Sequence, residues 1–183
     1  NANLWSIQTA PWALTLVALD GTAIIPVPPR GTHEEDLLPS HTVTLWAYTD
    51  MADPRWTWGS RYVLLRHNER LSPQKAGMLS SDGWVGHARA GCFFLKTFNY
   101  ESDGGYPDSG CSVEVFTRWD ATEVETLGPL RTLQPDAVAE HVEEWYLFDR
   151  VSRPATEAEV DRDILPLVQK ARKSGPSSNP NRL

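Results

Sequence analysis

A chain of 183 residues is long enough for one substantial domain with a hydrophobic core. Hydrophobic residues make up 40% of it and charged residues 22%, a balance typical of a globular protein and not of a disordered one. The formal net charge of -7, without any basic run, argues against a nucleic-acid or anionic-membrane partner, and no apolar stretch is long enough to span a bilayer.

Two apolar runs near the start of the chain flank the dipeptide Asp20-Gly21. The runs ALTLVAL (13–19) and TAIIPVP (22–28) predict strands, and Asp-Gly between two such runs predicts a tight β-hairpin. The two prolines of the second run place that strand at an edge or end it early. The polar segment that follows, RGTHEEDLLPSH, predicts a surface loop.

The middle of the chain alternates between strand patterns and loops. We predict strands in TVTLWAY, YVLLRHN, GWVGHAR and CFFLKTFNY, the last two pairing across Ala90-Gly91. We predict loops for TDMADPRWTWGSRY and ESDGGYPDSG, and a loop or short helical turn for NERLSPQKAGMLSSDG.

The stretch from Cys111 to Phe148 predicts three further strands, because apolar and polar residues alternate in it with a period of two. Carboxylates are frequent there. Glu114 lies on the first of these strands and Glu125 on the second. The third strand places His141, Glu143 and Trp145 on one face, so this stretch is where a functional site could be built.

The pattern changes after the last strand. Thr156 and Glu159 form a capping box, and helical spacing continues to Lys173, with Pro166 weakening the middle of the helix. We therefore predict one all-β domain over residues 1–150 and a C-terminal helix over residues 151–173. The remaining residues, 174–183, predict a disordered polar tail.

The cysteines and histidines do not show the sequence spacing of metal ligands. The two cysteines, Cys92 and Cys111, are not in a CxxC arrangement and are interpreted as thiols more readily than as a disulfide. The five histidines show no HxxxH spacing, and no P-loop, Rossmann glycine pattern or nucleophile elbow occurs. The sequence therefore predicts no metal and no cofactor.

Several long motifs resemble an uncharacterised bacterial family of the galactose mutarotase-like (aldose 1-epimerase-like) superfamily. The resemblance covers nearly everything from Asn3 to Val168, and it rests on APWALT, LWAYTDMADPRWTWGSRYVLLR, PQKAG, YPDSGCSVEVFT and ETLGPL…EHVEEWYLF. It implies an antiparallel β-supersandwich. The motifs are specific for the family and not for a reaction.

The resemblance also implies that the chain is the C-terminal part of a longer protein. Members of the family have a further N-terminal half, and the chain begins with Asn1 instead of Met. We therefore expect the supersandwich to be incomplete, with the missing half as its partner. No intact signal peptide is present, which slightly favours a cytoplasmic location.

Mutarotation needs a base for the anomeric hydroxyl proton and an acid for the ring oxygen. Glu125 resembles the base position of mutarotases, Glu114 is the second candidate, and His141 is a candidate acid. Mutarotases carry a His in the strand equivalent to APWALT, where this chain has Trp12. The same carboxylates also fit a structural role as hydrogen-bonded strand residues.

Sugars stack their C–H faces on indoles and hydrogen-bond to charged groups. One loop supplies both kinds of group, in Asp50, Arg55, Trp56, Trp58 and Arg61. Lys75 and Lys96, with Arg61, could hold a phosphate or carboxylate of the sugar. The structural alternative is that a Trp fills the core and the Arg–Asp pairs fasten the loop.

The sequence therefore predicts a carbohydrate-binding protein of the mutarotase-like type, with a small-molecule sugar as ligand and interconversion of sugar anomers as its candidate reaction. The alternative is a non-catalytic glycan-binding or accessory β-sandwich domain.

Overall fold

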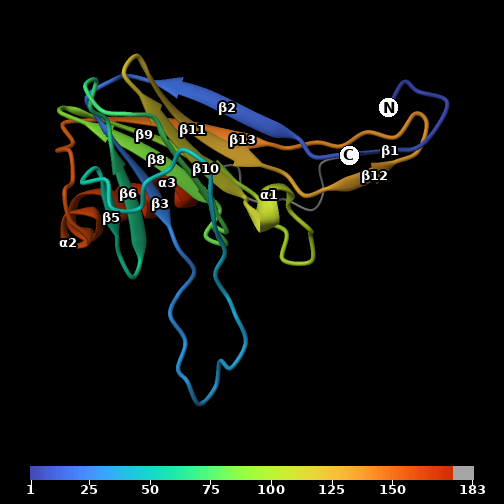
Figure 1. Cartoon of the computed structure of the whole chain (residues 1–183), viewed down its shortest axis with the longest axis horizontal. Coiled ribbons are helices and arrows are strands. Elements are labelled where there is room, and N and C mark those ends of the chain that lie inside the picture. Colours follow the sequence, from blue (N-terminus) through green and yellow to red (C-terminus); the bar gives the residue numbers. More distant parts are fainter. Residues whose placement is uncertain (175–183) are drawn as a thin grey trace.

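A computed structural model describes residues 1–174 and shows an all-β sandwich with one helical segment at its C-terminal end (Figure 1). Two antiparallel sheets face each other. The five-stranded sheet has the order β2-β11-β10-β7-β4, and the six-stranded sheet has the order β13-β9-β8-β3-β6-β5. The predicted fold class, an antiparallel β-sandwich with a C-terminal helix, is confirmed.

The five-stranded sheet consists of β2 (Trp12–Val17), β11 (Ala121–Leu127), β10 (Val113–Arg118), β7 (Gln74–Met78) and β4 (Val43–Leu45). The six-stranded sheet consists of β13 (Glu143–Asp149), β9 (Cys92–Phe98), β8 (Trp84–Arg89), β3 (Thr22–Pro26), β6 (Tyr62–Arg66) and β5 (Trp56–Trp58). A short helical turn, α1 (Pro107–Gly110), precedes β10.

Two apolar layers hold the sandwich together. The first lies between the sheets, where Val113, Val115 and Val124 meet residues such as Ile25 and Val85. The second lies on the far face of the six-stranded sheet, where residues such as Ile24 and Phe93 meet the C-terminal helical segment. The six-stranded sheet is therefore the middle layer, and β3 is buried on both faces, as its continuous apolar run requires.

The C-terminal segment consists of α2 (Glu157–Glu159), a π-helical turn η1 (Val160–Ile164) and α3 (Leu165–Ser174). The predicted capping box is confirmed, because the Thr156 side chain accepts from the Glu159 backbone and the Glu159 carboxylate accepts from the Thr156 backbone. The π turn lies just before Pro166, where a proline ring would clash with the carbonyl of an ordinary α-helix. The predicted tail lies outside the described residues, apart from Ser174, which ends α3.

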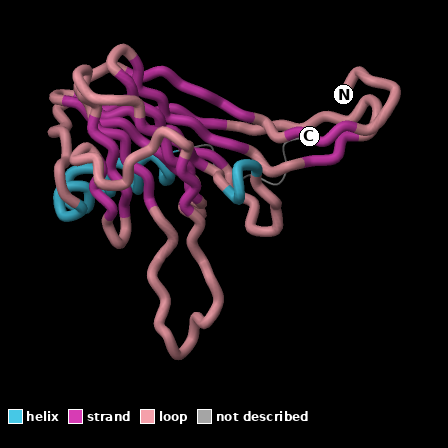
Figure 2. Tube along the Cα trace, in the orientation of Figure 1, coloured by secondary structure: helices cyan, strands magenta, loops and turns pink. Residues whose placement is uncertain are grey.

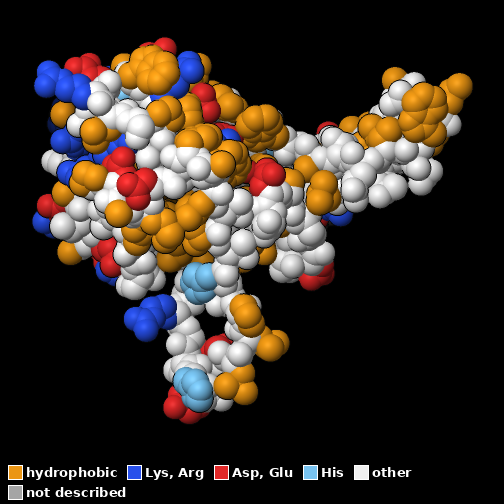
Figure 3. Space-filling view, in the orientation of Figure 1, with side chains coloured by type: hydrophobic (Ala, Val, Ile, Leu, Met, Phe, Trp, Pro, Cys, Tyr) orange, Lys and Arg blue, Asp and Glu red, His pale blue; other side chains and the backbone are white. Residues whose placement is uncertain are grey.

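Two segments project from the sandwich, as Figure 2 shows. One is the loop of residues 27–42 between β3 and β4. The other, called the arm, is the ribbon of β1 (Ile7–Thr9) and β12 (Arg131–Leu133) with its connecting residues. Apolar side chains lie at the end of the arm (Figure 3), where Leu4 and Trp5 are largely exposed.

Three local predictions were wrong. The strands flanking Asp20-Gly21 do not form a hairpin, because β2 belongs to the five-stranded sheet and β3 to the six-stranded sheet. The stretch 68–83 contains a strand, β7, and the stretch 49–62 contains another, β5. The predicted β8–β9 hairpin is confirmed. The cysteines are free thiols, with Cys111 buried and Cys92 half-buried.

Candidate functional site

The face of the five-stranded sheet that points away from the core brings together residues from four strands. Glu114 on β10 and Glu125 on β11 are register partners, and they alternate with valines that face the core. Both carboxylates therefore point away from the core. Lys75, on β7, is the register partner of Phe116, which lies two residues after Glu114 on β10. The Lys75 side chain is therefore on the same face of the sheet as the two carboxylates.

Lys75 joins the two carboxylates. Its ammonium lies 2.8 Å from Oε2 of Glu114 and 3.0 Å from each oxygen of Glu125. The Trp12 indole also donates to Oε2 of Glu125, at 2.8 Å. The Lys75 nitrogen lies over two indole rings, 4.6 Å from the centroid of Trp46 and 5.5 Å from that of Trp12.

Gly77 makes room for this group. It is the register partner of Glu114 on β7. A Cβ atom at Gly77 would lie 2.6 Å from Sγ of Cys111 and 3.1 Å from Cγ of Glu114. Any larger residue would therefore clash with the Cys111 thiol and crowd the Glu114 side chain.

A cavity of about 400 Å³ opens above these residues. We call it the Trp12–Trp46 cavity, and its lining consists of Ala10, Trp12, Trp46, Lys75, Pro107, Asp108, Glu114, Leu127 and Leu130. A volume of this order lies within the range of small-molecule sites, which are mostly apolar with a few polar groups. The charged groups of this lining come from β7, β10 and the α1 turn.

The protonation of the group follows from its burial. Burial raises the pKa of Glu114 to about 7, against the opposing effect of Lys75. Burial alone would lower the pKa of Lys75, but hydrogen bonds and charges from Glu114 and Glu125 outweigh it and raise that pKa. Near neutral pH, Glu114 therefore exists in both protonation states, beside a lysine that stays charged.

The two carboxylates differ in whether they have an oxygen free to accept a further hydrogen bond. Glu125 is fully buried, and Lys75 and Trp12 occupy its oxygens. Oε1 of Glu114 is buried and has no hydrogen-bond partner within residues 1–174. Glu114 lines the cavity, and the lining does not include Glu125. The geometry thus gives Glu114 a spare acceptor and gives Glu125 the role of holding Lys75.

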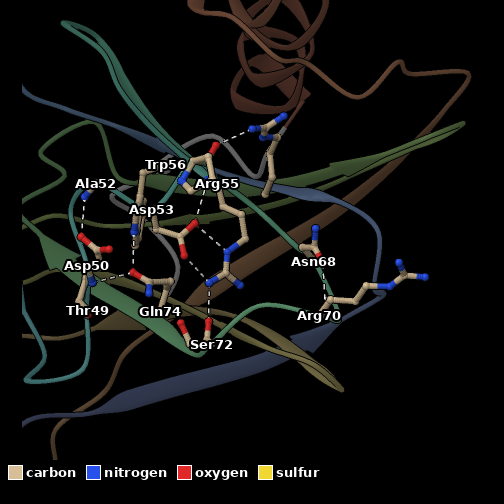
Figure 4. A network of polar contacts seen from close by, with 12 residues as sticks. Thr49, Asp50, Ala52, Asp53, Arg55, Trp56, Asn68, Arg70, Ser72 and Gln74 are labelled. Carbon is tan, nitrogen blue, oxygen red and sulfur yellow. Dashed lines mark hydrogen bonds and ion pairs between the residues drawn. The ribbon is translucent and has the colours of Figure 1, made fainter.

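The predicted sugar-binding loop, residues 49–62, lies outside the cavity lining and is held in place by its own contacts (Figure 4). Arg55 forms a buried pair with Asp53 at 2.7 Å and also donates to the Ser72 carbonyl. Hydrogen bonding to Arg55 lowers the pKa of Asp53. The Trp56 indole is buried in the core and donates to the Gln74 side chain at 3.0 Å.

The other predicted ligand-binding residues of this loop also contact partners within the protein. The Asp50 backbone donates to the same Gln74 oxygen, and Trp58 stacks on Trp56 with centroids 4.7 Å apart. Arg61 pairs with Asp161, on the helical segment. Among the described residues that line the Trp12–Trp46 cavity, none comes from this loop.

Lys96 and His141 belong to a second polar cluster, between the sheets. The Lys96 ammonium is 2.6 Å from Glu143 and donates to Ala13 and Thr15 on β2. Burial lowers its pKa. His141 shares the Thr126 hydroxyl with Glu143, and burial lowers the pKa of His141. This cluster joins the sheets and is separate from the cavity lining.

Sequence reasoning thus named three members of the site, Lys75, Glu114 and Glu125, and the structure brings them together. It missed Trp46 and Asp108, and it noted Trp12 only as a replacement for His. The available signal for Trp46 was its place within the predicted strand TVTLWAY, on the face opposite its core-facing neighbour Leu45.

The described residues contain no group of three or more His, Cys, Asp or Glu side chains placed to hold a metal ion. No helix within residues 1–174 is long and apolar enough to cross a membrane. Comparisons with protein-family models, curated proteins and solved structures find no match to the chain.

Proposed function

We propose that the Trp12–Trp46 cavity binds a small polyhydroxylated ligand of monosaccharide type, and that Glu114 transfers a proton at its anomeric centre. The observation that carries the proposal is Glu114 itself. It is 2% exposed, it lines a cavity walled by two indoles, and one of its oxygens has no partner among the described residues.

The residues that line the cavity support a sugar as its ligand. Indole faces pack against the C–H faces of sugars, and carboxylates accept hydrogen bonds from sugar hydroxyls. Trp12 is 58% exposed, so a large part of its ring is free to contact a ligand. Leu127 and Leu130 supply further apolar surface.

The chemistry needs a group that gains and loses a proton near neutral pH. With a pKa of about 7, Glu114 in its ionised form accepts the anomeric hydroxyl proton as the bond between C1 and the ring oxygen breaks, and the resulting neutral carboxyl gives this proton to the ring oxygen. Reclosure on either face reverses both proton transfers and exchanges the anomers. In this proposal, Glu125 acts on the reaction by fixing Lys75.

Polarimetry of freshly dissolved α-glucose and α-galactose tests the proposal. We expect the wild-type chain to accelerate the approach to equilibrium, and Glu114→Gln to reduce that acceleration about 100-fold, the usual weight of a general base. Glu144→Gln, a glutamate on β13 that contacts Tyr146, is the matched control and should leave the rate unchanged. Equal rates for Glu114→Gln and wild type would contradict the role of Glu114.

A non-catalytic sugar-binding domain is the second candidate. It is favoured by Glu125, whose oxygens are held by Lys75 and Trp12 and are not free to act as a second acid or base. In that case, wild-type protein binds a hexose in calorimetry but leaves the rate of anomer exchange unchanged. Trp12→Ala should then weaken binding without unfolding the chain.

A further inference from the structure

The charges of the Trp12–Trp46 cavity restrict the kind of sugar that it can take. Lys75 is the cation among the described residues of its lining, and an ammonium has three N–H donors. Those donors face Oε2 of Glu114 and both oxygens of Glu125, at 2.8 to 3.0 Å. Lys75 thus has no free donor for a phosphate or carboxylate of the ligand.

The other cations predicted to bind an anion are also occupied. Arg61 pairs with Asp161 on the helical segment, and Lys96 pairs with Glu143 between the sheets. Neither lines the cavity. The cluster of Lys75, Lys96 and Arg61 considered from the sequence is therefore not assembled.

Carboxyl groups outnumber the ammonium at the site. Asp108 and Glu114 line the cavity, and Glu125 lies directly behind Lys75. Asp108 is exposed at the rim, on the α1 turn. Because opposite charges attract strongly where water is excluded, this surplus favours a cationic ligand and disfavours an anionic one.

A second, independent observation points to a donor on the ligand. Oε1 of Glu114 is buried without a hydrogen-bond partner among residues 1–174, and an unpaired buried acceptor is costly. An ammonium on the ligand supplies a charge-assisted donor, which forms stronger hydrogen bonds than a hydroxyl does. The faces of Trp12 and Trp46 already lie beside one ammonium, that of Lys75, so the walls suit cations.

We propose that the cavity selects amine-bearing sugars, of the 2-amino-2-deoxy hexose class, over neutral hexoses and rejects anionic sugars. The ligand ammonium donates to Glu114 and lies within the field of Asp108. This inference rests on the proposed function, because it assumes that the cavity takes a monosaccharide.

Isothermal titration calorimetry of the whole chain with glucosamine, glucose and glucuronate, at pH 7 and low salt, tests the inference. We expect glucosamine to bind about tenfold more tightly than glucose, since a charge-assisted hydrogen bond contributes on that scale. Glucuronate should bind more weakly than glucose. Added salt should narrow both differences, because it screens charges at the exposed rim.

Asp108→Asn and Asp103→Asn distinguish the effect of charges at the cavity from the effect of the protein's net charge. Asp108→Asn keeps the left-handed backbone that this position adopts, since Asn tolerates positive φ. It should reduce the preference for glucosamine several-fold. Asp103→Asn makes the same charge change in the adjacent exposed loop, outside the cavity lining, and should leave the preference intact. Glu114→Gln should abolish the preference in protein whose thermal melt shows that it is folded.

The outcomes are distinguishable. Equal affinity for glucose and glucosamine, or tighter binding of glucuronate, would overturn this inference and leave the proposed sugar site standing. If none of the three sugars binds, both proposals fail. An equal loss of preference in Asp103→Asn and Asp108→Asn would assign the effect to net charge and would also overturn the inference.

Discussion

Lys75, Glu114 and Glu125 form one buried, hydrogen-bonded group although they come from three different strands. Glu114 and Glu125 belong to strands whose alternation is plain in the sequence, so their shared face could be derived. Lys75 and Trp46 join them through β7, which lies beside β10, and β4, which lies beside β7, and one sequence does not contain the register of these pairings. Trp12 likewise reaches Glu125 across the β2–β11 pairing.

His87 makes the fold sensitive to acid. It is 3% exposed, and its Nε2 has no hydrogen-bond partner within the described chain. Burial lowers its pKa from 6.5 to about 4, with Arg89 and His67 adding to the effect. Because the unfolded chain takes up this proton at higher pH than the folded chain, stability from this residue is complete above about pH 6.5 and falls as the pH drops toward 4.

We expect His87→Gln to remove this part of the pH dependence, which amounts to about 3 kcal/mol at most. Urea unfolding at a series of pH values between neutral and 4 measures it. The carboxylates titrate in both proteins, so the difference between wild type and variant isolates His87. Parallel curves for the two proteins would show that His87 does not titrate in this way.

At the scale of elements, the Asp-Gly signal led to a wrong strand pairing. The chain bends at Asp20, which has positive φ, but β2 and β3 enter different sheets. The environments of the two strands differ, because β2 alternates between exposed and half-buried residues, with Trp12, Leu14 and Leu16 exposed, whereas every residue of β3 is buried. Strands with such different environments belong to different layers, and that difference outweighs the Asp-Gly preference for a hairpin.

The strand β7 was missed because its residues have weak β-propensity. Gln, Lys, Ala and Gly are not typical strand residues, and tertiary context decides such cases. β7 forms because it lies between β10 and β4, with hydrogen-bonding neighbours on both sides. The sequence alone does not contain that placement, so the central position of Lys75 could not be predicted.

The capping box at Thr156 makes the C-terminal helical segment testable. Thr156→Ala removes the side-chain acceptor for the Glu159 backbone and should lower the free energy of unfolding by about 1 kcal/mol. Because the segment covers one face of the six-stranded sheet, the loss should appear in global urea unfolding. Thr156→Ser keeps the acceptor and should remain close to wild type, and an equal loss in both variants would contradict a capping role.

For the whole molecule, the class of fold was predictable from the frequency of alternating strands and from one capped helix. The two projecting segments were not, because nothing in a local pattern tells whether a loop packs against the sandwich. The identity of the edge strands was not predictable either, and two of them are β2 and β13. Leu16 on β2 and Leu147 on β13 are 67% and 72% exposed.

We predict that the chain self-associates through β2. WALTLV contains no charge and no proline, and such an edge is a template for pairing with another strand. Leu14→Lys places a charge at the middle of this edge and should shift sedimentation toward monomer. Leu38→Lys, on the projecting loop, is the control and should not. A wild-type chain that stays monomeric as its concentration rises would contradict the prediction.

The burial of Lys96 has a consequence for chemical labelling. The chain has four lysines, and Lys170 and Lys173 are exposed on α3. An amine-acylating reagent should modify those two first and reach Lys96 only when the two sheets separate, because Lys96 is fully buried between them. Lys75 should react at an intermediate rate that falls when a ligand fills the cavity. Mass spectrometry of the labelled peptides would then follow the opening of the sandwich and the occupancy of the cavity in the same sample.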